Sequence, residues 1–157
     1  QFDETHSLET VALRYFNVYG PGQDADSEYA AVVPAFVSAV LDDEQPIVYG
    51  NGEQTRDFIH VRDVAEATVE SILSDATGTY NVASGTETSV NELLNTVLEA
   101  TSSDMKPRYE PERKGDIERS YADVSKIRDE IGFETSVDLR EGIQTVADSY
   151  EENARNV

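Results

Sequence analysis

The sequence predicts an α/β fold, in which strands alternate with amphipathic helices along the chain. The clearest strand signal is residues 11–16 (VALRYF), an almost continuous apolar run that is typical of a strand buried on both faces of a parallel sheet. Apolar residues at helical spacing follow from about residue 33. Residues 89–92 (SVNE) form a capping box, which marks a further helix start. The alternation of the two element types defines the α/β class.

The first expected strand contains one charged side chain, Arg14. A buried arginine needs a partner, so Arg14 is expected either in an ion pair in the core or directed at a ligand. The next element is a helix near residues 33–41, in which Pro34 is compatible only with the first turn. Residues 47–49 then predict a short strand, which the glycine-containing turn 50–52 closes.

The middle of the chain predicts two strands with a helix between them. The strands are expected at residues 57–61 and 79–83, and the helix at about residues 63–73. One face of this helix is expected to carry its apolar side chains, which are Ala65, Val69, Ile72 and Leu73. Such a face normally packs against the sheet.

The last part of the chain predicts three helices. The capping box at residues 89–92 opens the first, and a short extended piece is expected at 106–109. Asp123 is expected to cap the second helix, which Gly132 ends. The pair at positions 138 and 141 repeats the capping pattern ahead of the final helix, which is expected to fray into a polar end.

Composition restricts the partners. The 157 residues include 32 Asp and Glu against 12 Lys and Arg, a formal net charge of −20, which argues against nucleic acid or an anionic membrane as a partner. The excess of carboxylates and scarcity of lysine favour a halophilic source, with an acidic interaction tail as the weaker alternative because the charge is spread along the chain. Persistent periodicity and caps argue against disorder, despite the low hydrophobicity.

Several kinds of site are not expected. The chain has no cysteine for disulfides or thiolate zinc sites, and its two isolated histidines make a poor metal site. With neither a membrane-length apolar run nor a secretory signal, the cytoplasm is the expected location. Residues 20–25 formally fit a dinucleotide loop, but the acidic residues that follow would repel a pyrophosphate. No tyrosine has a lysine four positions later, so no self-contained catalytic set is expected.

Positive charge concentrates at residues 106–119, which hold five basic and four acidic groups. These arginines could bind an anionic ligand such as a phosphate, or they could pair locally with neighbouring glutamates. Arg56, between a glycine-containing turn and a strand, leaves the same two interpretations open. Asn17 ends a strand at the edge where open α/β sheets bind ligands. Tyr49 could stack on a base or pack in the core.

These motifs together resemble one family. The segments that carry the resemblance are residues 13–21 (LRYFNVYGP), 48–52 (VYGNG), 54–61 (QTRDFIHV), 63–65 (DVA), 80–83 (YNVA), 113–116 (RKGD) and 120–126 (SYADVSK). Their order and type are similar to those of extended short-chain dehydrogenases/reductases, specifically the nucleotide-sugar epimerases and dehydratases, and most of all the UDP-glucose 4-epimerase branch. The resemblance extends over essentially the whole chain.

The resemblance implies the C-terminal part of a Rossmann-type fold, with the last sheet strands near 11–16 and 79–83 and a small mixed α/β substrate-binding region. It assigns substrate contacts to Asn17, Ala31, Val32, Val48, Tyr49, Arg56, Arg113 and Asp116. Among these, Arg56 and Arg113 would clamp phosphates, Asp116 would bond the ribose or base region, and Tyr49 would flank the base. Tyr15 and Phe16 would edge the nicotinamide pocket of NAD.

The family's glycine-rich NAD loop and its Tyr-x-x-x-Lys pair have no counterpart in this sequence. Residues 1–157 are therefore expected to be the C-terminal, substrate-binding half, with the N-terminal NAD-binding half absent. The parent enzyme would use NAD to oxidise the sugar at C4 transiently and return the hydride, while this chain alone would bind no cofactor and supply no catalytic residue. The expected partners are a nucleotide sugar, the missing half and, as a further candidate, a second copy. The alternatives are a stand-alone nucleotide-sugar-binding module and a structural, dimerising domain.

Overall fold

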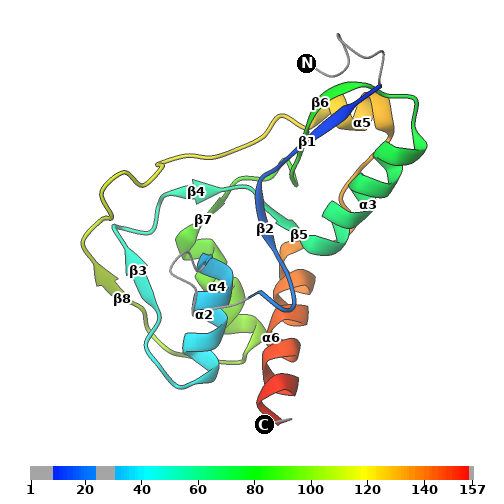
Figure 1. Ribbon diagram of the computed structural model, residues 1–157. Coiled ribbons are helices and arrows are strands. Elements are labelled where there is room, and N and C mark those ends of the chain that lie inside the picture. The colour runs from blue at the N-terminus through cyan, green and yellow to red at the C-terminus, as the bar shows by residue number, and fades with distance from the viewer. Residues whose placement is uncertain (1–8, 24–30, 156–157) are drawn as a thin grey trace.

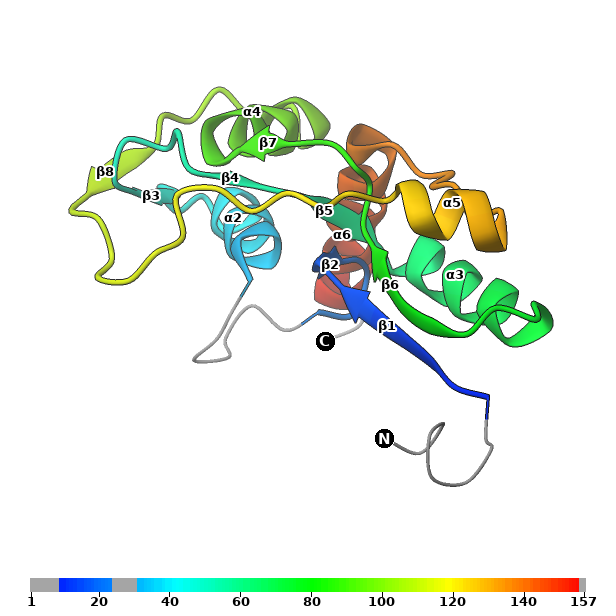
Figure 2. The same cartoon turned by 90° about the horizontal axis from the view of Figure 1, so that it is seen from above.

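The computed structural model describes residues 9–23 and 31–155, and it has the mixed α/β architecture that the sequence predicts (Figure 1). The strands are β1 (Val11–Tyr15), β2 (Asn17–Tyr19), β3 (Ile47–Tyr49), β4 (Thr55–Arg56), β5 (Phe58–His60), β6 (Gly78–Val82), β7 (Thr88–Ser89) and β8 (Arg108–Glu110). The helices are α2 (Val32–Leu41), α3 (Val61–Leu73), α4 (Val90–Ala100), α5 (Ser125–Ile131) and α6 (Leu139–Arg155). Strands β2 and β5 lie centrally, with β1, β6, α3 and α5 to one side and the remaining strands with α2 and α4 to the other (Figures 1 and 2).

Each strand pairs with one other strand. At two bends in the chain, the strand before the bend and the strand after it pair with different partners. Strand β1 pairs in parallel with β6, and β2, one residue further on, pairs in parallel with β5. Strand β4 pairs antiparallel with β7, whereas β3 pairs in parallel with β8. The bends fall at Phe16, whose N–H donates to Val82 O at 3.1 Å, and at Asp57, whose carbonyl accepts from Asn17 N at 3.1 Å. Asp57 therefore lies where the two groups of elements meet.

Two apolar cores stabilise the fold, and β5 contributes to both. Phe58 packs with α2, α4, α6, Tyr19 and Val48 in the larger core. Ile59, the next residue, points to the opposite side and packs with α3, β6 and α5 in the smaller core. Alternation of side chains across a strand explains how one short strand supports both cores. The larger core is closed by α6, which contacts both α2 and α4.

The local signals for helix ends are confirmed at three ends and wrong at the start of α5. Its N-cap is Val124, which has no side-chain cap, and the predicted cap Asp123 lies one residue earlier, where its carboxylate accepts from Ser125 N at 2.9 Å. Helix α4 begins with the predicted capping box, in which Ser89 Oγ accepts from Glu92 N and the Glu92 carboxylate accepts from Ser89 N. Gly132 ends α5 in the left-handed conformation, with φ +88°. Asp138 accepts from Glu141 N at 2.9 Å at the start of α6. The proline of α2 lies in its first turn, as expected.

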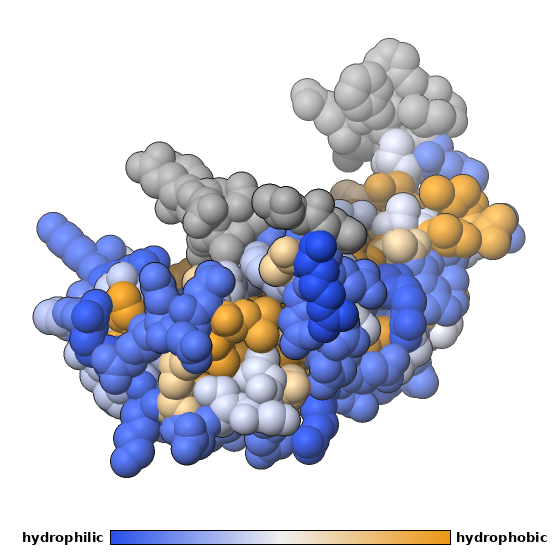
Figure 3. All heavy atoms as spheres, turned by 90° about the horizontal axis from the view of Figure 1, so that it is seen from below, coloured by the Kyte–Doolittle hydropathy of each residue, from blue (hydrophilic) through white to orange (hydrophobic). Residues whose placement is uncertain are grey.

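Helix α3 differs from the sequence prediction in its start and in the face that it buries. It begins at Val61, because the His60 ring accepts from Arg62 N and so caps the helix. The buried face consists of Asp63, Val64, Ala67 and Ser71. The predicted apolar face is exposed, with Val69 53%, Ile72 75% and Leu73 80% accessible, and exposed apolar side chains interrupt the hydrophilic surface in Figure 3. Two residues of the buried face, Ala67 and Ser71, have small side chains, which let α3 approach the strands closely.

Strand β1 is not buried on both faces. Its parallel pairing is as predicted, but Ala12, Arg14 and Tyr15 are exposed and only Val11 and Leu13 are half-buried. The reason is that α3 covers one face of the strand. Arg14 on the uncovered face consequently needs no buried partner, which corrects the predicted burial and ion pair in the core, whereas the alternative that Arg14 is directed at a ligand stays a prediction. No helix in the described part of the chain is both long and apolar enough to cross a membrane.

Candidate functional site

Four of the predicted substrate residues form one cluster beside β3 and β4. The Arg113 guanidinium lies over the Tyr49 ring, 3.8 Å from its centroid. Arg56 pairs with the carboxylate of Asp116, and Asp116 N donates to Arg113 O at 3.2 Å. These residues come from two segments far apart in sequence. Tyr49 ends β3 and Arg56 ends β4, whereas Arg113 and Asp116 belong to residues 113–122, which we call the clamp arm. The cluster thus unites the aromatic ring, both arginines and the acidic residue that the resemblance implies.

The two arginines of the cluster differ in how far their guanidinium groups are already occupied by hydrogen-bond partners within the protein. Arg56 Nη1 donates to the carbonyls of Thr55 and Ile117, and Nη2 donates to Asp116. These bonds hold Arg56 in place and occupy three of its five N–H donors. Arg113 is exposed, and no carboxylate in residues 9–23 or 31–155 lies within ion-pair distance of it. Arg113 is therefore the cation of the cluster that is best placed to receive an anion.

The clamp arm is attached to β4 through backbone and side-chain contacts. Thr55 N donates to Glu118 O at 2.9 Å, and Ser120 N donates to Thr55 O at 3.1 Å. Arg119 Nη2 donates to Glu87 Oε2 at 2.6 Å, and Thr55 Oγ1 donates to Glu87 Oε1 at 2.6 Å. The partner of Arg119 is thus a distant glutamate on the loop before β7, rather than one of the adjacent glutamates that local pairing would use.

The pairing of Glu87 with Arg119 shifts the pKa values of both side chains. The side-chain hydrogen bond from Arg119, followed by that from Thr55, lowers the pKa of Glu87. The same hydrogen bond raises the pKa of Arg119. Both side chains remain charged over the whole physiological range, so this contact does not open with ordinary changes of pH.

A cavity of about 560 Å³ opens between the turn after β3 and the clamp arm. Its walls are formed by Gly50, Asn51, Glu53, Gln54, Glu112, Asp116, Ile117 and Glu118. The carboxylates and amides of this lining accept hydrogen bonds, which suits the hydroxyl and N–H groups of a nucleoside. The phosphates of the same ligand would need the arginine side. The cavity and the cluster together therefore match a ligand with a neutral, hydroxyl-bearing end and an anionic end.

The rim of the cavity has a defined shape because of Gly52. Its φ of +76° is unfavourable for other residues, and a Cβ there would lie 2.1 Å from Asn91 Oδ1. Asn91 donates in turn to Asn51 O at 3.0 Å and accepts from Tyr109 Oη at 3.1 Å. The first turn of α4 thus holds the turn 50–52 from behind.

The other predicted substrate residues lie around this cluster. Asn17 is on the strand beside Asp57, and its Nδ2 donates to Asp57 O at 3.0 Å. The Val48 side chain is completely buried in the larger core, so only its backbone can face a ligand. Ala31 is the N-cap of α2 and Val32 its first residue, and Val32 packs against the larger core. Residues 24–30, which hold the acidic stretch after the rejected dinucleotide loop, fall outside the described residues.

Tyr15 and Phe16 occupy the end of β1. Phe16 is half-buried at the carboxyl end of this parallel strand, the edge at which α/β sheets bind flat cofactor rings. Tyr15 is 49% exposed, and its hydroxyl lies 3.1 Å from Thr68 Oγ1 in a groove between β1 and α3. The cofactor contact that the resemblance implies for Tyr15 and Phe16 stays a prediction. In residues 9–23 and 31–155, no group of three or more His, Cys, Asp or Glu side chains could hold a metal ion.

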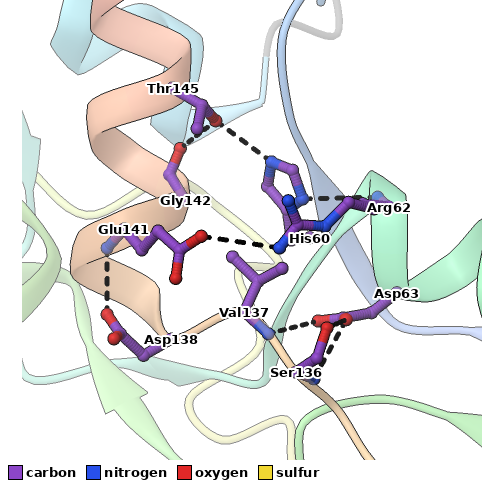
Figure 4. A network of polar contacts seen from close by, with 9 residues as sticks. All are labelled: His60, Arg62, Asp63, Ser136, Val137, Asp138, Glu141, Gly142 and Thr145. Carbon is purple, nitrogen blue, oxygen red and sulfur yellow. Dashed lines mark hydrogen bonds and ion pairs between the residues drawn. The ribbon is translucent and has the colours of Figure 1, made fainter.

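A second polar network joins α3 to the start of α6 (Figure 4). His60 Nε2 lies 3.2 Å from Thr145 Oγ1, and Arg62 pairs with Glu141 across the same gap. The Asp63 carboxylate, 1% exposed, accepts from Ser136 N and Oγ and from Val137 N. All three contacts are between distant segments, so the sequence pattern alone could not pair them. They fix α6 against the central strands and lie apart from the cavity.

The fold and the similarity to known proteins define the class of protein. The elements are those of the C-terminal part of a Rossmann-type extended short-chain dehydrogenase/reductase, with the last sheet strands and a small mixed α/β region. The family model described as GDP-mannose 4,6 dehydratase matches residues 1–146. The chain belongs to this family of extended short-chain dehydrogenases/reductases and is UDP-glucose 4-epimerase-like within it.

Curated relatives include sugar-nucleotide epimerases. A putative UDP-glucose 4-epimerase of Methanocaldococcus jannaschii is 36% identical over 154 residues, which cover 98% of this chain and 50% of that protein. The UDP-glucose 4-epimerase of Mycolicibacterium smegmatis is 35% identical over 146 residues, which cover 92% of this chain and 46% of that protein. The chain thus spans about half the length of these curated relatives.

Solved structures give the same picture. The UDP-N-acetylglucosamine 4-epimerase of Methanobrevibacter ruminantium, in complex with UDP-N-acetylmuramic acid, has a TM-score of 0.93 and 43% identity, over 97% of this chain and 49% of that one. The Thermotoga maritima UDP-glucose 4-epimerase with UDP-glucose has a TM-score of 0.93 and 35% identity, over 98% and 49%. The Thermus thermophilus UDP-glucose 4-epimerase, in complex with NAD, has a TM-score of 0.86 and 35% identity, over 96% and 49%.

Proposed function

We propose that this chain is the nucleotide-sugar-binding part of an NAD-dependent sugar 4-epimerase and that it binds a UDP-hexose at the clamp. The observation that carries the proposal is the exposed Arg113 guanidinium, which stacks on Tyr49 and has no acidic partner in the described part of the chain. Arg56, held by Asp116, adds a second cation beside it. Arginine guanidinium groups bind phosphate through charge-assisted hydrogen bonds, which are often bidentate, so a diphosphate suits a cluster that holds two of them.

The remaining predicted residues complete the proposed site. The base would lie against Tyr49 beside the backbone of Val48, and Asp116 would accept from the ribose or base. Asn17, Ala31 and Val32 would meet the sugar and diphosphate. Tyr15 and Phe16 would edge the nicotinamide, which supplies the hydride acceptor in the whole protein. The bound cofactor would supply reversible hydride transfer. Loss of the C4–H hydride and the hydroxyl proton would give a 4-keto sugar, and return of the hydride to its opposite face and of the proton to its oxygen would form the epimer.

The decisive experiment is a calorimetric titration of the purified chain with UDP, repeated on Arg113→Ala. We expect saturable binding that weakens at least about tenfold in the variant, because a charge-assisted hydrogen bond contributes about 1.5–3 kcal/mol. The matched control is Arg140→Ala, which removes an exposed arginine of α6 that pairs with Glu99. The absence of heat with the unaltered chain, or equal affinity in the two variants, would overturn the proposal.

The proposed division of roles between this chain and the rest of the enzyme has its own test. Purified chain incubated with UDP-glucose and NAD should form no UDP-galactose, since we assign it substrate binding and no acid or base. Formation of UDP-galactose above the rate of a buffer control would show that the chain is catalytic by itself and would contradict this division.

The second candidate function is a structural domain that dimerises. Val69, Ile72 and Leu73 of α3 are more than half exposed and lie next to the groove along β1. Exposed apolar surface of this kind favours association. Light scattering at increasing protein concentration distinguishes the candidates, because a monomer at all concentrations would exclude dimerisation, whereas UDP binding by a dimer would be compatible with both.

A further inference from the structure

Asp57 is completely buried, and its carboxylate contacts two separate segments, the loop after β6 and the end of the clamp arm. Its Oδ1 accepts from Ser84 N at 2.8 Å and from Ser84 Oγ at 2.7 Å. Its Oδ2 accepts from Gly85 N at 3.1 Å and from Ala122 N at 3.3 Å. Four donors satisfy the charge without a cation, which is how a buried carboxylate can remain stable.

The position of Asp57 connects it to both sides of the proposed binding site. It directly follows Arg56, and its carbonyl accepts from Asn17 N and Nδ2. Its carboxylate holds Ala122, at the end of the clamp arm that carries Arg113 and Asp116. One side chain therefore fixes the strand end and the arm relative to each other.

Glu87 anchors the same arm from the surface. Its carboxylate receives two hydrogen bonds from Arg119 and one from Thr55, which precedes Arg56. Asp57 and Glu87 thus hold the two ends of residues 119–122 against β4 and the loop between β6 and β7. Neither carboxylate lines the cavity.

We propose that Asp57 and Glu87 are positioning residues of the nucleotide site, which set the distance between Arg56 and Arg113 without touching the ligand. This inference rests on the proposed function, because it concerns affinity at the same clamp. A pre-positioned arm lowers the cost of ordering the arginine when the ligand binds. Loosening the arm should consequently weaken binding even when the fold and both arginines are intact.

The Asp57→Asn variant weakens the attachment of the arm selectively. An amide has one oxygen and one NH₂ group, so it can keep the two donors of Ser84 on its oxygen. Its NH₂ group then faces the N–H groups of Gly85 and Ala122, and an NH₂ group cannot accept a hydrogen bond from either of them. The hydrogen bond from Ala122 N, which attaches the clamp arm, is therefore broken in the variant.

Asp63→Asn is the matched control. Asp63 is also buried and also accepts from a serine N–H and hydroxyl, at 3.0 and 2.8 Å, and from the next N–H, at 3.3 Å. Its partners, Ser136 and Val137, belong to the segment before α6 (Figure 4). The two variants should lose comparable stability, but only one of them loosens the clamp.

The experiment measures UDP affinity by calorimetry and unfolding by urea for the unaltered chain, Asp57→Asn, Asp63→Asn and Arg113→Ala. We expect Asp57→Asn to raise the Kd for UDP about tenfold, and Asp63→Asn to leave it within about twofold at similar loss of stability. Equal affinity in Asp57→Asn and the unaltered chain would overturn the inference. If the unaltered chain does not bind UDP, or Arg113→Ala binds as tightly, the proposed function itself has failed.

A second variant decides the question if Asp57→Asn does not fold. Residue 87 lies near the surface. Glu87→Gln keeps the hydrogen bond from Thr55, but it loses the negative charge of the carboxylate, whose two oxygens both accept from Arg119. We expect it to raise the Kd for UDP about threefold, whereas Glu99→Gln, which breaks the surface pair with Arg140, should not change it. An unchanged Kd in Glu87→Gln would overturn the inference.

Discussion

At the scale of single residues, Gly142 shows how a local preference is overruled by packing. Alanine in place of a helical glycine normally stabilises a protein by about 0.5–1 kcal/mol. Here a Cβ at position 142 would lie 2.2 Å from the Tyr19 hydroxyl oxygen in the buried contact between α6 and β2. Because overpacking costs about 1–3 kcal/mol, we predict that Gly142→Ala lowers the free energy of unfolding in urea.

The Tyr19→Phe background is the control for this prediction. Removing the hydroxyl oxygen leaves the ring carbons, 2.8 and 2.9 Å from the added Cβ, as the nearest atoms. Gly142→Ala should therefore cost less in this background than in the unaltered chain. A variant Gly142→Ala as stable as the unaltered chain would show that the two elements separate without cost.

His60 gives the fold a pH dependence of known sign. Its Nδ1 accepts from Arg62 N, so the proton of the neutral ring is on Nε2, which donates to Thr145 Oγ1. Burial, with a smaller contribution from Arg62, lowers its pKa from the usual 6.5, although Asp63 and Glu141 oppose the shift. The unfolded chain then binds this proton more readily than the folded chain. The contribution of neutral His60 to the free energy of unfolding is therefore fully present above pH 6.5 and is lost as the pH falls below it.

His60→Asn tests this pH dependence. Asparagine can cap α3 with its side-chain oxygen and does not titrate. We predict that the free energy of unfolding of the unaltered chain falls between about pH 7 and about pH 5.5, and that this fall is smaller in the variant. The carboxylates with lowered pKa values, such as Glu87 and Glu92, act only at lower pH. Parallel pH profiles would contradict the role of His60.

At the scale of elements, α3 presents the largest difference between its apolar pattern and its packing. Val64 is 9% exposed and packs in the smaller core, whereas Ile72 is 75% exposed. We predict that Val64→Ala lowers the free energy of unfolding by about 1.5–2 kcal/mol, about two buried methylene equivalents. Ile72→Ala should change it by less than about 0.5 kcal/mol. A larger loss for Ile72→Ala would show that the chain buries this face in solution, for example in a dimer.

Elements were predictable from the sequence where their signal is local. The caps at Ser89 and Gly132 depend on hydrogen bonds and dihedral angles within a few residues, and the structure confirms both. The orientation of α3 and the exposure of Arg14 depend on which surfaces distant segments cover, and both predictions were wrong. In the site, the cluster of Tyr49 with the clamp arm followed from resemblance, whereas the anchoring of that arm by Glu87 spans 32 residues and has no local signal.

At the scale of the whole molecule, the charge is the dominant property. A net charge of −20 on 157 residues repels itself in dilute buffer and opposes the compact state. The screening length is about 10 Å at 0.1 M salt and about 3 Å at 1 M salt, so added salt removes most of this repulsion. We therefore predict that the unfolding temperature rises when KCl is increased from about 0.1 M to about 1 M, and this rise tests the interpretation that the acidic composition is an adaptation to salt.

The same measurement in a salt-free osmolyte provides the control for this last prediction. Sucrose favours burial through exclusion from the protein surface but does not screen charge. A steep rise at low KCl that levels off as the screening length approaches the spacing of neighbouring side chains would identify electrostatic repulsion as the cause. If KCl lowered the unfolding temperature or left it unchanged, the charge would not limit stability. The excess of carboxylates would then have to be explained by a partner whose cationic groups bind the acidic surface.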